Sequence, residues 1–280
     1  MTKHVLHNPL AGKMGLDEIK SSFSELFPQD TFEFKNVTEL ENVNDYINAI
    51  PTDEDIIVCG GDGTISRFVN AIKDVEFNHK LWYYACGSGN DFLRDVGKDG
   101  NKLVDMTEYI KKLPRVIVQG KEYCFLNGVG YGIDGYCCEK GDEMRAKSDK
   151  PVNYTSIAIN GLLFNYKPTD ATIIVDGVEH KFKHVWLAPT MYGKYYGGGM
   201  IPAPEQKRGD DAVSVMAFYG WFKLGVLMVF PSIFKGEHVK HKNNIAVFSG
   251  KEITVKFDSP RTLQIDGETI FNVSEYTVKR

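Results

Sequence analysis

Three short segments in the first third of the chain combine glycines with polar side chains that could take part in chemistry. They read NPLAGK at 8–13, GGDGT at 60–64 and GSGND at 87–91. Glycines let backbone N–H groups approach an anion closely, and the amino end of a following helix adds partial positive charge. Each segment alone could be an ordinary tight turn. Three of them at one edge of a sheet would favour a phosphate-binding site.

The carboxylate in the second segment, Asp62, needs its own explanation because it would repel a phosphate. A divalent cation between the two groups would remove the repulsion, and the carboxylate could also orient a hydroxyl. That chemistry suits a magnesium nucleotide. The alternative is an aspartate that caps a helix or closes a turn, and the residues alone leave both interpretations open.

Alternating strand and helix patterns over residues 1–95 must position these segments. Apolar strands are predicted at 4–8, 31–37, 55–59 and 81–86, with amphipathic helices between them. Repeated β-α units predict a doubly wound, mostly parallel sheet with helices on its faces. The three segments then lie at the carboxyl edge of that sheet, where ligands of α/β proteins bind.

The sequence after about residue 113 is predicted to form mainly antiparallel β-structure. Short strands alternate with turn residues, EITVKFD and RTLQID are interpreted as separate strands, and Asp176-Gly177 is a strong type I′ hairpin signal. Helices are predicted near 136–147 and 152–165. The fold class is therefore an α/β domain of the NAD kinase type followed by an antiparallel β-sandwich domain.

The composition agrees with two soluble domains. The chain has 280 residues, 42% of them hydrophobic, and a net charge of −4, which argues against a nucleic-acid binder. Five cysteines without a C-x-x-C pair indicate free thiols in a reducing compartment. No secretory signal is recognised, and no run reaches the roughly 18 apolar residues of a membrane span, so we expect a cytoplasmic protein. The expected domains are a nucleotide-binding domain at 1–113, which the C-terminal strand 271–280 could join, and a β-rich substrate or lid domain at 114–270.

Other templates do not explain the sequence. No Walker loop of the form G-x-x-x-x-G-K-[ST] is present. GYGIDG at 130–135 matches G-x-G-x-x-G, but the acidic residue that a dinucleotide site needs about 20 residues further on is missing. We therefore interpret it as a structural turn. The histidines lack the spacing typical of metal ligands, and His238 and His241 are expected at the surface.

The order and spacing of HNPLAGK, GGDGT and GSGNDFLRD resemble the diacylglycerol kinase catalytic-domain family of bacterial lipid kinases. The same superfamily includes sphingosine kinases and, more distantly, NAD kinases and phosphofructokinases. The resemblance continues through FLNGVGYGIDG, YYGGGMIPAPEQKRGDDAVSVMAF and LQIDGE, so it covers nearly the whole chain. GGDGT alone would indicate only the superfamily, whereas GSGNDF together with the late DGE is specific to the lipid branch.

The resemblance implies an ATP- and Mg²⁺-dependent kinase that phosphorylates a lipid hydroxyl, with a diacylglycerol-like acceptor. Glu268, in IDGE at the end of an apolar strand, matches the family's proposed general base. Asp62 would help to align the acceptor, and Asp266 could hold Glu268 or contact magnesium indirectly. Without the resemblance, a solvent-facing glutamate after a turn would be the preferred interpretation of Glu268.

The resemblance also implies binding residues for the metal and the nucleotide. A magnesium site away from the phosphates maps onto Asp211 and the main-chain carbonyls of Arg208 and Val213, where Ala212 replaces the family's glycine. The residues that would hold ATP are Asn8, Lys13, Thr38, Gly60, Gly61, Asp62, Gly63, Thr64, Ile65, Ser66, Gly87, Ser88, Asn90 and Asp91.

Two other functions stay open: a soluble-metabolite kinase similar to NAD kinase, and a nucleotide-binding regulator without turnover. A lipid acceptor would bring the protein to a membrane, so a transient peripheral contact at the inner membrane surface is expected. Residues 221–234 are almost continuously apolar, and Lys235, Lys240 and Lys242 follow. The apolar part is interpreted as a buried helix and the lysines as the better membrane candidate. The sequence allows a homodimer without indicating one.

Overall fold

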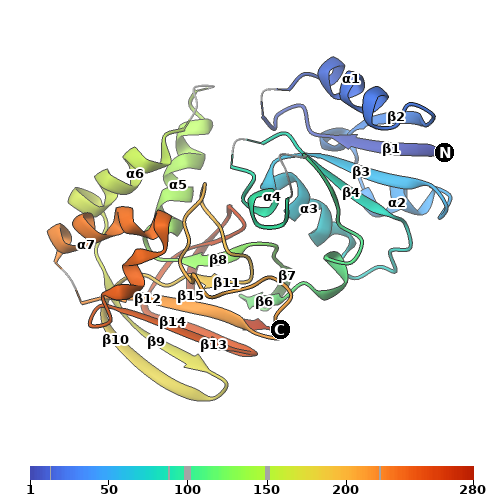
Figure 1. Ribbon diagram of the computed structural model, residues 1–280. Coiled ribbons are helices and arrows are strands. Elements are labelled where there is room, and N and C mark those ends of the chain that lie inside the picture. Colours follow the sequence, from blue (N-terminus) through green and yellow to red (C-terminus); the bar gives the residue numbers. More distant parts are fainter. Residues whose placement is uncertain (13, 88, 98–101, 149–151, 221) are drawn as a thin grey trace. The chain divides into compact units, whose positions relative to one another are not determined.

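The computed structural model describes residues 1–12, 14–87, 89–97, 102–148, 152–220 and 222–280 (Figure 1). The chain divides into two compact units, Met1–Leu113 and Pro114–Arg280. The C-terminal strand pairs with strands of the second unit, so it does not join the first unit.

The first unit is built on a five-stranded sheet with the order β2-β1-β3-β4-β5 (Figure 1). Its pairings are parallel except that β5 runs antiparallel to β4, and the predicted α/β fold is confirmed. The strands are β1 (Thr2–His7), β2 (Thr31–Asn36), β3 (Asp55–Gly60), β4 (Leu81–Ala85) and β5 (Leu103–Asp105). The helices are α1 (Leu16–Leu26), η1 (Val37–Glu39), α2 (Val43–Asn48), α3 (Asp62–Ile72), α4 (Asp91–Val96) and η2 (Ile110–Lys112).

Helices pack against both faces of this sheet, which explains why the central strands are apolar along their whole length. β3 is buried at every residue. α1 packs Ile19 and Phe23 against the face that carries Ile57. Val58, the next residue, points to the opposite face, where α3 contributes Phe68 to the core.

The second unit is an antiparallel β-structure, as predicted. Its path is β7-β6-β15-β14-β8-β11-β12-β10-β9, with β13 paired to β12, and β9 also pairs with β14 so that part of the sheet closes on itself. The strands are β6 (Arg115–Val118), β7 (Lys121–Cys124), β8 (Gly128–Tyr131), β9 (Thr169–Val175), β10 (Val178–Leu187), β11 (Thr190–Met191), β12 (Val213–Tyr219), β13 (Ile245–Gly250), β14 (Glu252–Ile265) and β15 (Glu268–Lys279). The helices are α5 (Ile133–Arg145), α6 (Tyr154–Asn160), the π-helical turn η3 (Gly161–Asn165), α7 (Lys223–Val229), η4 (Phe230–Lys235) and η5 (Glu237–Lys240).

The predicted hairpin at Asp176-Gly177 is confirmed, since both residues have positive φ, 47° and 83°, as a type I′ turn requires. β14, in contrast, is one strand where the sequence predicts two. Its pairing with β15 shifts register between Lys256 and Arg261, so the strand passes through an irregularity at Ser259 without ending there.

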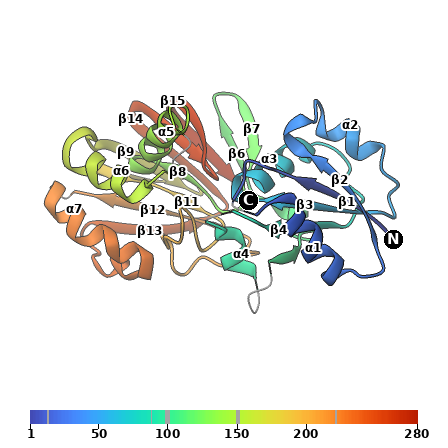
Figure 2. The same ribbon diagram turned by 90° about the horizontal axis from the view of Figure 1, so that it is seen from above.

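The helices of the second unit pack on one another and on the β-structure. Figure 2 shows α5 beside β14, in agreement with the contacts between these elements. α5 begins earlier than predicted, at Ile133. The segment interpreted as a structural turn is therefore a strand-to-helix junction, in which Gly132 adopts a φ of 121° and a Cβ would lie 2.4 Å from the carbonyl oxygen of Trp186. Only glycine fits at that position.

Candidate functional site

The three glycine segments of the first unit meet at one edge of the sheet. β1, β3 and β4 are parallel neighbours, and all three segments follow their carboxyl ends. Backbone hydrogen bonds link the segments: Asn8 N donates to Cys59 O at 3.0 Å, and Cys86 N donates to Gly60 O at 2.8 Å. The structure thus brings together residues that the sequence separates by about 80 positions, as parallel strands require.

Close backbone contact explains two of these glycines without a ligand. A Cβ on Gly87 would lie 2.5 Å from the Cα of Gly61. A Cβ on Gly12, whose φ is +83°, would lie 1.7 Å from the carbonyl oxygen of Cys86. Side chains at either position would push the segments apart, so glycine is needed for the segments to converge.

The Asp62 carboxylate joins two of the segments. Its Oδ2 accepts a hydrogen bond from Asp91 N at 2.9 Å, and its Oδ1 accepts one from Phe92 N at 3.0 Å. These amides form the first turn of α4, so Asp62 caps a neighbouring helix although it stands in the first turn of α3. Each carboxylate oxygen keeps a further lone pair, because such an oxygen can accept more than one bond. Asp62 is therefore a helix-capping aspartate, as one of the two interpretations of the sequence held. The helix that it caps is α4, whereas the residue itself belongs to α3.

Asparagines complete the junction on both sides. Asn8 Nδ2 donates to Thr64 Oγ1 at 2.9 Å, which connects the first segment to the second. Asn90 has a left-handed φ of 49°, and its Nδ2 donates to Gly87 O at 2.7 Å. Asn90 Oδ1 is buried without a hydrogen-bond partner among the described residues. Buried acceptors normally have a partner, so this atom marks a strained point of the junction.

The other residues that the sequence assigns to the nucleotide differ in their burial and in their hydrogen bonds. Thr38 is exposed in η1, just after β2, and its N and Oγ1 donate to Asn36 Oδ1. Ile65 is fully buried in the core and Ser66 almost so, and Ile65 N donates to Gly61 O, which leaves Ile65 no side-chain role toward a ligand. Gly63 is partly exposed in the first turn of α3. Lys13 and Ser88 lie outside the described residues.

In the second unit, the Asp266 carboxylate anchors the IDGE turn. It accepts hydrogen bonds from Leu126 N at 2.6 Å, Asn127 N at 2.8 Å and Gly128 N at 3.0 Å. Asp266 and the following glycine have φ of 47° and 94°, the conformation of a type I′ turn. Asp266 therefore stabilises the backbone that carries Glu268, and the expected contact with magnesium has no support in these bonds.

Glu268 is the first residue of β15 and is half-buried. It pairs with Ile265 across the two-residue turn, so its backbone position is fixed by the hairpin. Gln264 adds a further restraint, because its Oε1 accepts a hydrogen bond from Gly267 N at 2.7 Å. A carboxylate on such a rigid hairpin meets the positional demand on a general base.

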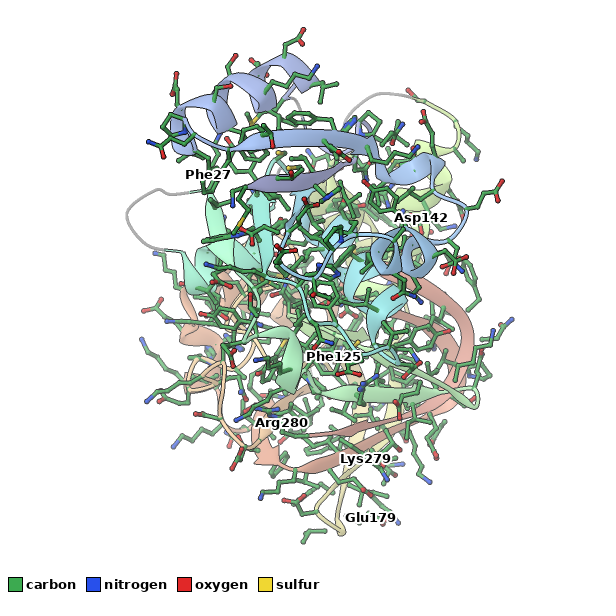
Figure 3. The ribbon with its side chains drawn as sticks, turned by 90° about the vertical axis from the view of Figure 1, so that its right-hand side faces the viewer. Phe27, Phe125, Asp142, Glu179, Lys279 and Arg280 are labelled. Atoms are coloured by element: carbon green, nitrogen blue, oxygen red, sulfur yellow. The ribbon has the colours of Figure 1, made fainter. Side chains whose placement is uncertain are left out.

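The predicted magnesium residues lie in a segment held by two arginines. Arg208 donates to Leu126 O at 2.5 Å and to Asn127 Oδ1 at 3.0 Å, so its side chain braces the segment that Asp266 also holds. Arg280, labelled in Figure 3, donates from Nε to Asp210 O at 2.8 Å. Asp211 is exposed. Among the described residues there is no group of three His, Cys, Asp or Glu side chains that could hold a metal, so Asp211 would need carbonyl or water ligands beside it.

A buried carboxyl that the sequence analysis overlooks is Asp134, at the start of α5. Burial raises the pKa of Asp134 to about 6. A hydrogen bond from Gly135 N to its carboxylate lowers the pKa and offsets part of that effect. Its Oδ2 and the buried hydroxyl of Tyr196 have no geometric hydrogen-bond partner in the described parts of the chain. A Cβ on Gly130 would lie 1.6 Å from Asp134 Oδ2 and 2.4 Å from Gln264 Nε2. An aspartate between the glycines of a strand-to-helix junction is the sequence signal that could have identified it.

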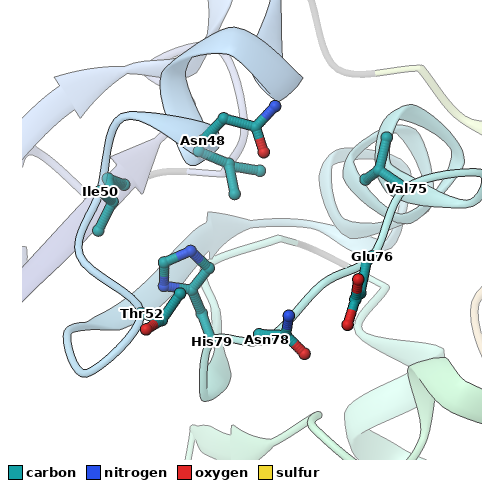
Figure 4. A pocket seen from close by; sticks show the side chains of 8 residues that line it. Asn48, Ile50, Thr52, Val75, Glu76, Asn78 and His79 are labelled. Atoms are coloured by element: carbon teal, nitrogen blue, oxygen red, sulfur yellow. The ribbon is translucent and has the colours of Figure 1, made fainter.

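A pocket in the first unit lies away from the glycine segments. Figure 4 shows it lined by Ile50 and Thr52 before β3 and by Asn78 and His79 before β4. These residues precede their strands, so the pocket lies at the amino edge of the sheet, opposite the carboxyl edge. His79 is buried, and its Nδ1 lies 3.2 Å from Glu54 O, which gives it a structural partner.

Both units match known protein families. Residues 3–120 match the model described as "Diacylglycerol kinase catalytic domain", and residues 127–277 match the "YegS C-terminal NAD kinase beta sandwich-like domain". The chain therefore belongs to the diacylglycerol kinase family that these two domains define. In the described parts of the chain, no helix has the length and apolarity that crossing a bilayer requires.

Relatives within this family carry kinase names. "Putative lipid kinase YtlR" of Bacillus subtilis strain 168 is 28% identical over 240 residues, which cover 76% of this chain and 73% of YtlR. "Diacylglycerol kinase" of Mycobacterium tuberculosis strain H37Rv is 26% identical over 193 residues, covering 66% of this chain and 61% of that protein. A crystal structure of "a putative diacylglycerol kinase" from Bacillus anthracis strain Sterne has a TM-score of 0.71 at 19% identity, covering 99% of this chain and 91% of the other. That similarity shows the fold.

Replacing Asp266 by asparagine should destabilise the second unit. The amide keeps one acceptor oxygen, but its NH₂ group would face a backbone N–H donor, and the charge that strengthens these bonds is lost. We expect a loss of about 2–3 kcal/mol in the free energy of unfolding, measured by urea denaturation. Asp258→Asn, an exposed position on the same hairpin, is the matched control and should change stability by less than about 0.5 kcal/mol. Equal effects of both variants would contradict the anchoring role of Asp266.

Asp134→Asn should change how stability depends on pH. The pKa of Asp134 is raised from 3.8 to about 6, so folding favours the protonated carboxyl, and wild-type stability falls as the pH rises toward that value and then levels off. Asparagine has no such proton to lose. The variant should therefore gain about 1–3 kcal/mol relative to the wild type between about pH 4 and pH 7. Urea unfolding at a series of pH values measures this difference, and parallel stability profiles would show that Asp134 does not titrate as described.

Proposed function

We propose that this protein is a lipid kinase that transfers the γ-phosphate of ATP to the hydroxyl of a diacylglycerol-like acceptor, with Mg²⁺ as the required cation. The observation that carries the proposal is the junction of three glycine segments around Asp62, in a chain that belongs to the diacylglycerol kinase family. Phosphoryl transfer needs a fixed γ-phosphate, neutralised charge and an aligned acceptor, and little covalent help from the protein.

The first unit would bind the phosphates of ATP at the amino end of α3. The first turn of a helix leaves amides without an intrahelical acceptor, and in α3 these are the amides of Asp62 and Gly63. α4 is a poorer candidate because Asp62 already accepts from its first two amides. Around this point the proposed nucleotide residues are Asn8, Thr38, Gly60, Gly61, Thr64, Ser66, Gly87, Asn90 and Asp91, together with Lys13 and Ser88 outside the described residues.

Glu268 would act as the general base. It takes the proton of the acceptor hydroxyl while the new bond to the γ-phosphorus forms and the bond to the β-phosphate oxygen breaks, which releases ADP. The support for this role is its position on a hairpin that Asp266 and Gln264 fix in place. Asp62 would orient the nucleotide through the lone pairs that its two capping bonds leave available.

Magnesium would bind at two kinds of oxygen donor. The cation that accompanies ATP would be shared with Asp62, and a second would lie at Asp211 with the carbonyls of Arg208 and Val213. One carboxylate, carbonyl oxygens and waters form the donor set that Mg²⁺ accepts in proteins, so the residue chemistry fits the ion. The nearby guanidinium groups of Arg208 and Arg280 weaken such a site electrostatically, which predicts modest affinity.

A soluble-metabolite kinase is the second candidate, and one observation favours it. The family model of the second unit is described as NAD kinase-like in its β-sandwich. The lipid-kinase and diacylglycerol kinase names of the relatives favour a lipid acceptor. A regulator without turnover has no observation in its favour.

The function is tested by transfer of radiolabelled phosphate from ATP into a total lipid extract with Mg²⁺, followed by identification of the labelled product. Glu268→Gln should lower kcat by about 10²–10⁴-fold with ATP affinity unchanged, because a glutamine cannot accept the proton.

Asp62→Asn should abolish transfer and also lower the melting temperature, because it weakens the cap on α4. Asp258→Asn should transfer phosphate at the wild-type rate. A wild-type rate in Glu268→Gln would show that Glu268 is not the general base. Label that appears only in a soluble metabolite such as NAD would show that the protein is a soluble-metabolite kinase.

The proposed magnesium site is tested separately with Asp211→Ala. Loss of the carboxylate should shift the Mg²⁺ titration of activity to higher concentration by about tenfold and leave ATP affinity at saturating Mg²⁺ unchanged. Asp210→Ala is the neighbouring control, because the Asp210 carbonyl accepts from Arg280 Nε and its N donates to Lys207 O, and alanine keeps both backbone bonds. Superimposed titration curves for Asp211→Ala and the wild type would contradict a metal site at Asp211.

A further inference from the structure

A large apolar surface of the second unit has no partner within that unit. Phe222 is 91% exposed, Met228 77%, Phe164 73% and Leu224 72%. These fractions are far above those of the core residues beneath them, such as Val226 at 1%. Contiguous exposed apolar side chains on a folded protein indicate a surface that another phase or molecule covers. We call this surface the α6–α7 patch, formed by Ile159, Phe164, Phe222, Leu224, Met228 and Phe234.

The patch residues come from two distant parts of the sequence that lie together in the fold. α6 and α7 lie side by side in both Figure 1 and Figure 2. Lys223 Nζ donates to Leu163 O at 2.8 Å, which ties the start of α7 to η3. The inner sides of the helices share one core cluster that includes Leu162 and Val226. Because this cluster fixes both helices, the exposed side chains are held on one rigid base.

Lysines are the only charged residues in the segments that form the patch. The chain contains 37 Asp and Glu residues, and none falls in 152–169 or 222–236. The same segments contain Lys167, Lys223 and Lys235. An apolar surface whose own segments carry lysines and no carboxylate matches the interface of an anionic bilayer, where apolar side chains enter the acyl boundary and lysines lie near the headgroups.

We propose that the α6–α7 patch docks this protein on an anionic lipid bilayer, with Phe164, Phe222 and Met228 inserted at the interface. The inference rests on the proposed function, because a lipid acceptor lies in a bilayer and must be taken from it. A second copy of the chain fits less well. A symmetric contact would bring the lysines of the two copies together, and the segments that form the patch contain no carboxylate to pair them.

The proposed membrane contact differs from the one that the sequence predicts: it is made by apolar residues on and near α7, and not mainly by the lysines that follow. The sequence favours Lys235, Lys240 and Lys242, but Lys240 lies 3.1 Å from Glu237 Oε1 in an ion pair that reduces its charge toward a membrane. His238, expected at the surface, is fully buried, and its Nε2 lies 2.9 Å from Pro202 O. Insertion of apolar side chains is therefore the main contribution, and lysine attraction is secondary.

The test is sedimentation of the full chain with vesicles of phosphatidylglycerol and phosphatidylcholine, and with vesicles of phosphatidylcholine alone. The patch variant is Phe222→Gln, Leu224→Gln and Met228→Gln together. The matched control is Val178→Gln with Val247→Gln, exposed apolar residues on strands of the same unit. The patch variant should lower the partition coefficient for anionic vesicles at least about tenfold, and the control should leave it unchanged. Melting temperatures and size-exclusion chromatography are recorded for every variant to establish folding and oligomeric state.

Three outcomes would overturn the inference. The wild-type chain binds neither kind of vesicle, or the folded patch variant binds vesicles as well as the wild type does. In the third outcome the wild type is a dimer and the patch variant is a monomer. The last would assign the patch to a second copy. Failure of the proposed function has a different signature. A chain that docks through the patch but phosphorylates no lipid keeps the docking surface and loses the lipid kinase. A chain that phosphorylates detergent-dispersed lipid without binding vesicles does the reverse.

Discussion

Backbone N–H groups at the ends of helices and strands need acceptors, and two aspartates meet this need where the chemistry is proposed. Asp62 accepts from the first turn of α4, and Asp266 accepts from three consecutive amides after residue 125. In each case a carboxylate from one motif fixes the backbone of another. A charged acceptor is suited to this because its hydrogen bonds are stronger than those of a neutral one. The glycine junction and the Glu268 hairpin both depend on these bonds.

The sequence predicts most of the fold because its strongest signals are local. Apolar strands with helices between them define the parallel sheet, and the pair Asp176-Gly177 defines a hairpin through backbone conformation alone. The convergence of the glycine segments also follows, since the strands that precede them are parallel neighbours. The failures concern interactions between residues far apart in the chain. β14 continues through Ser259 because it has partners along its length, including β9 and β8, which no local pattern shows.

The same reason explains what the sequence leaves out of the site. That Asp62 caps α4 and not its own helix depends on a partner about thirty residues later, and the isolated motif fits both arrangements. Asp134 looks like an ordinary junction residue until its burial is known. For the helix after residue 221, hydrophobicity predicts burial, whereas the structure turns Phe222, Leu224 and Met228 outward and buries Val226. Which side of an apolar helix faces the core is decided by the neighbouring elements.

The closure of the second sheet has a consequence for how the chain folds during synthesis. All strands of the first unit lie before residue 106, so that unit can form early and from near neighbours. The second unit cannot form early, because β6 pairs with β15 near the end of the chain. In that pairing Val118 lies opposite Tyr276. At about 5–20 residues per second, the ribosome needs on the order of 10–30 s between these strands. During that interval the β6–β7 and β9–β10 hairpins lack their later partners β15 and β14, and in this incomplete state aggregation competes with folding. The hairpin that carries Glu268 is thus among the last parts of the molecule to form.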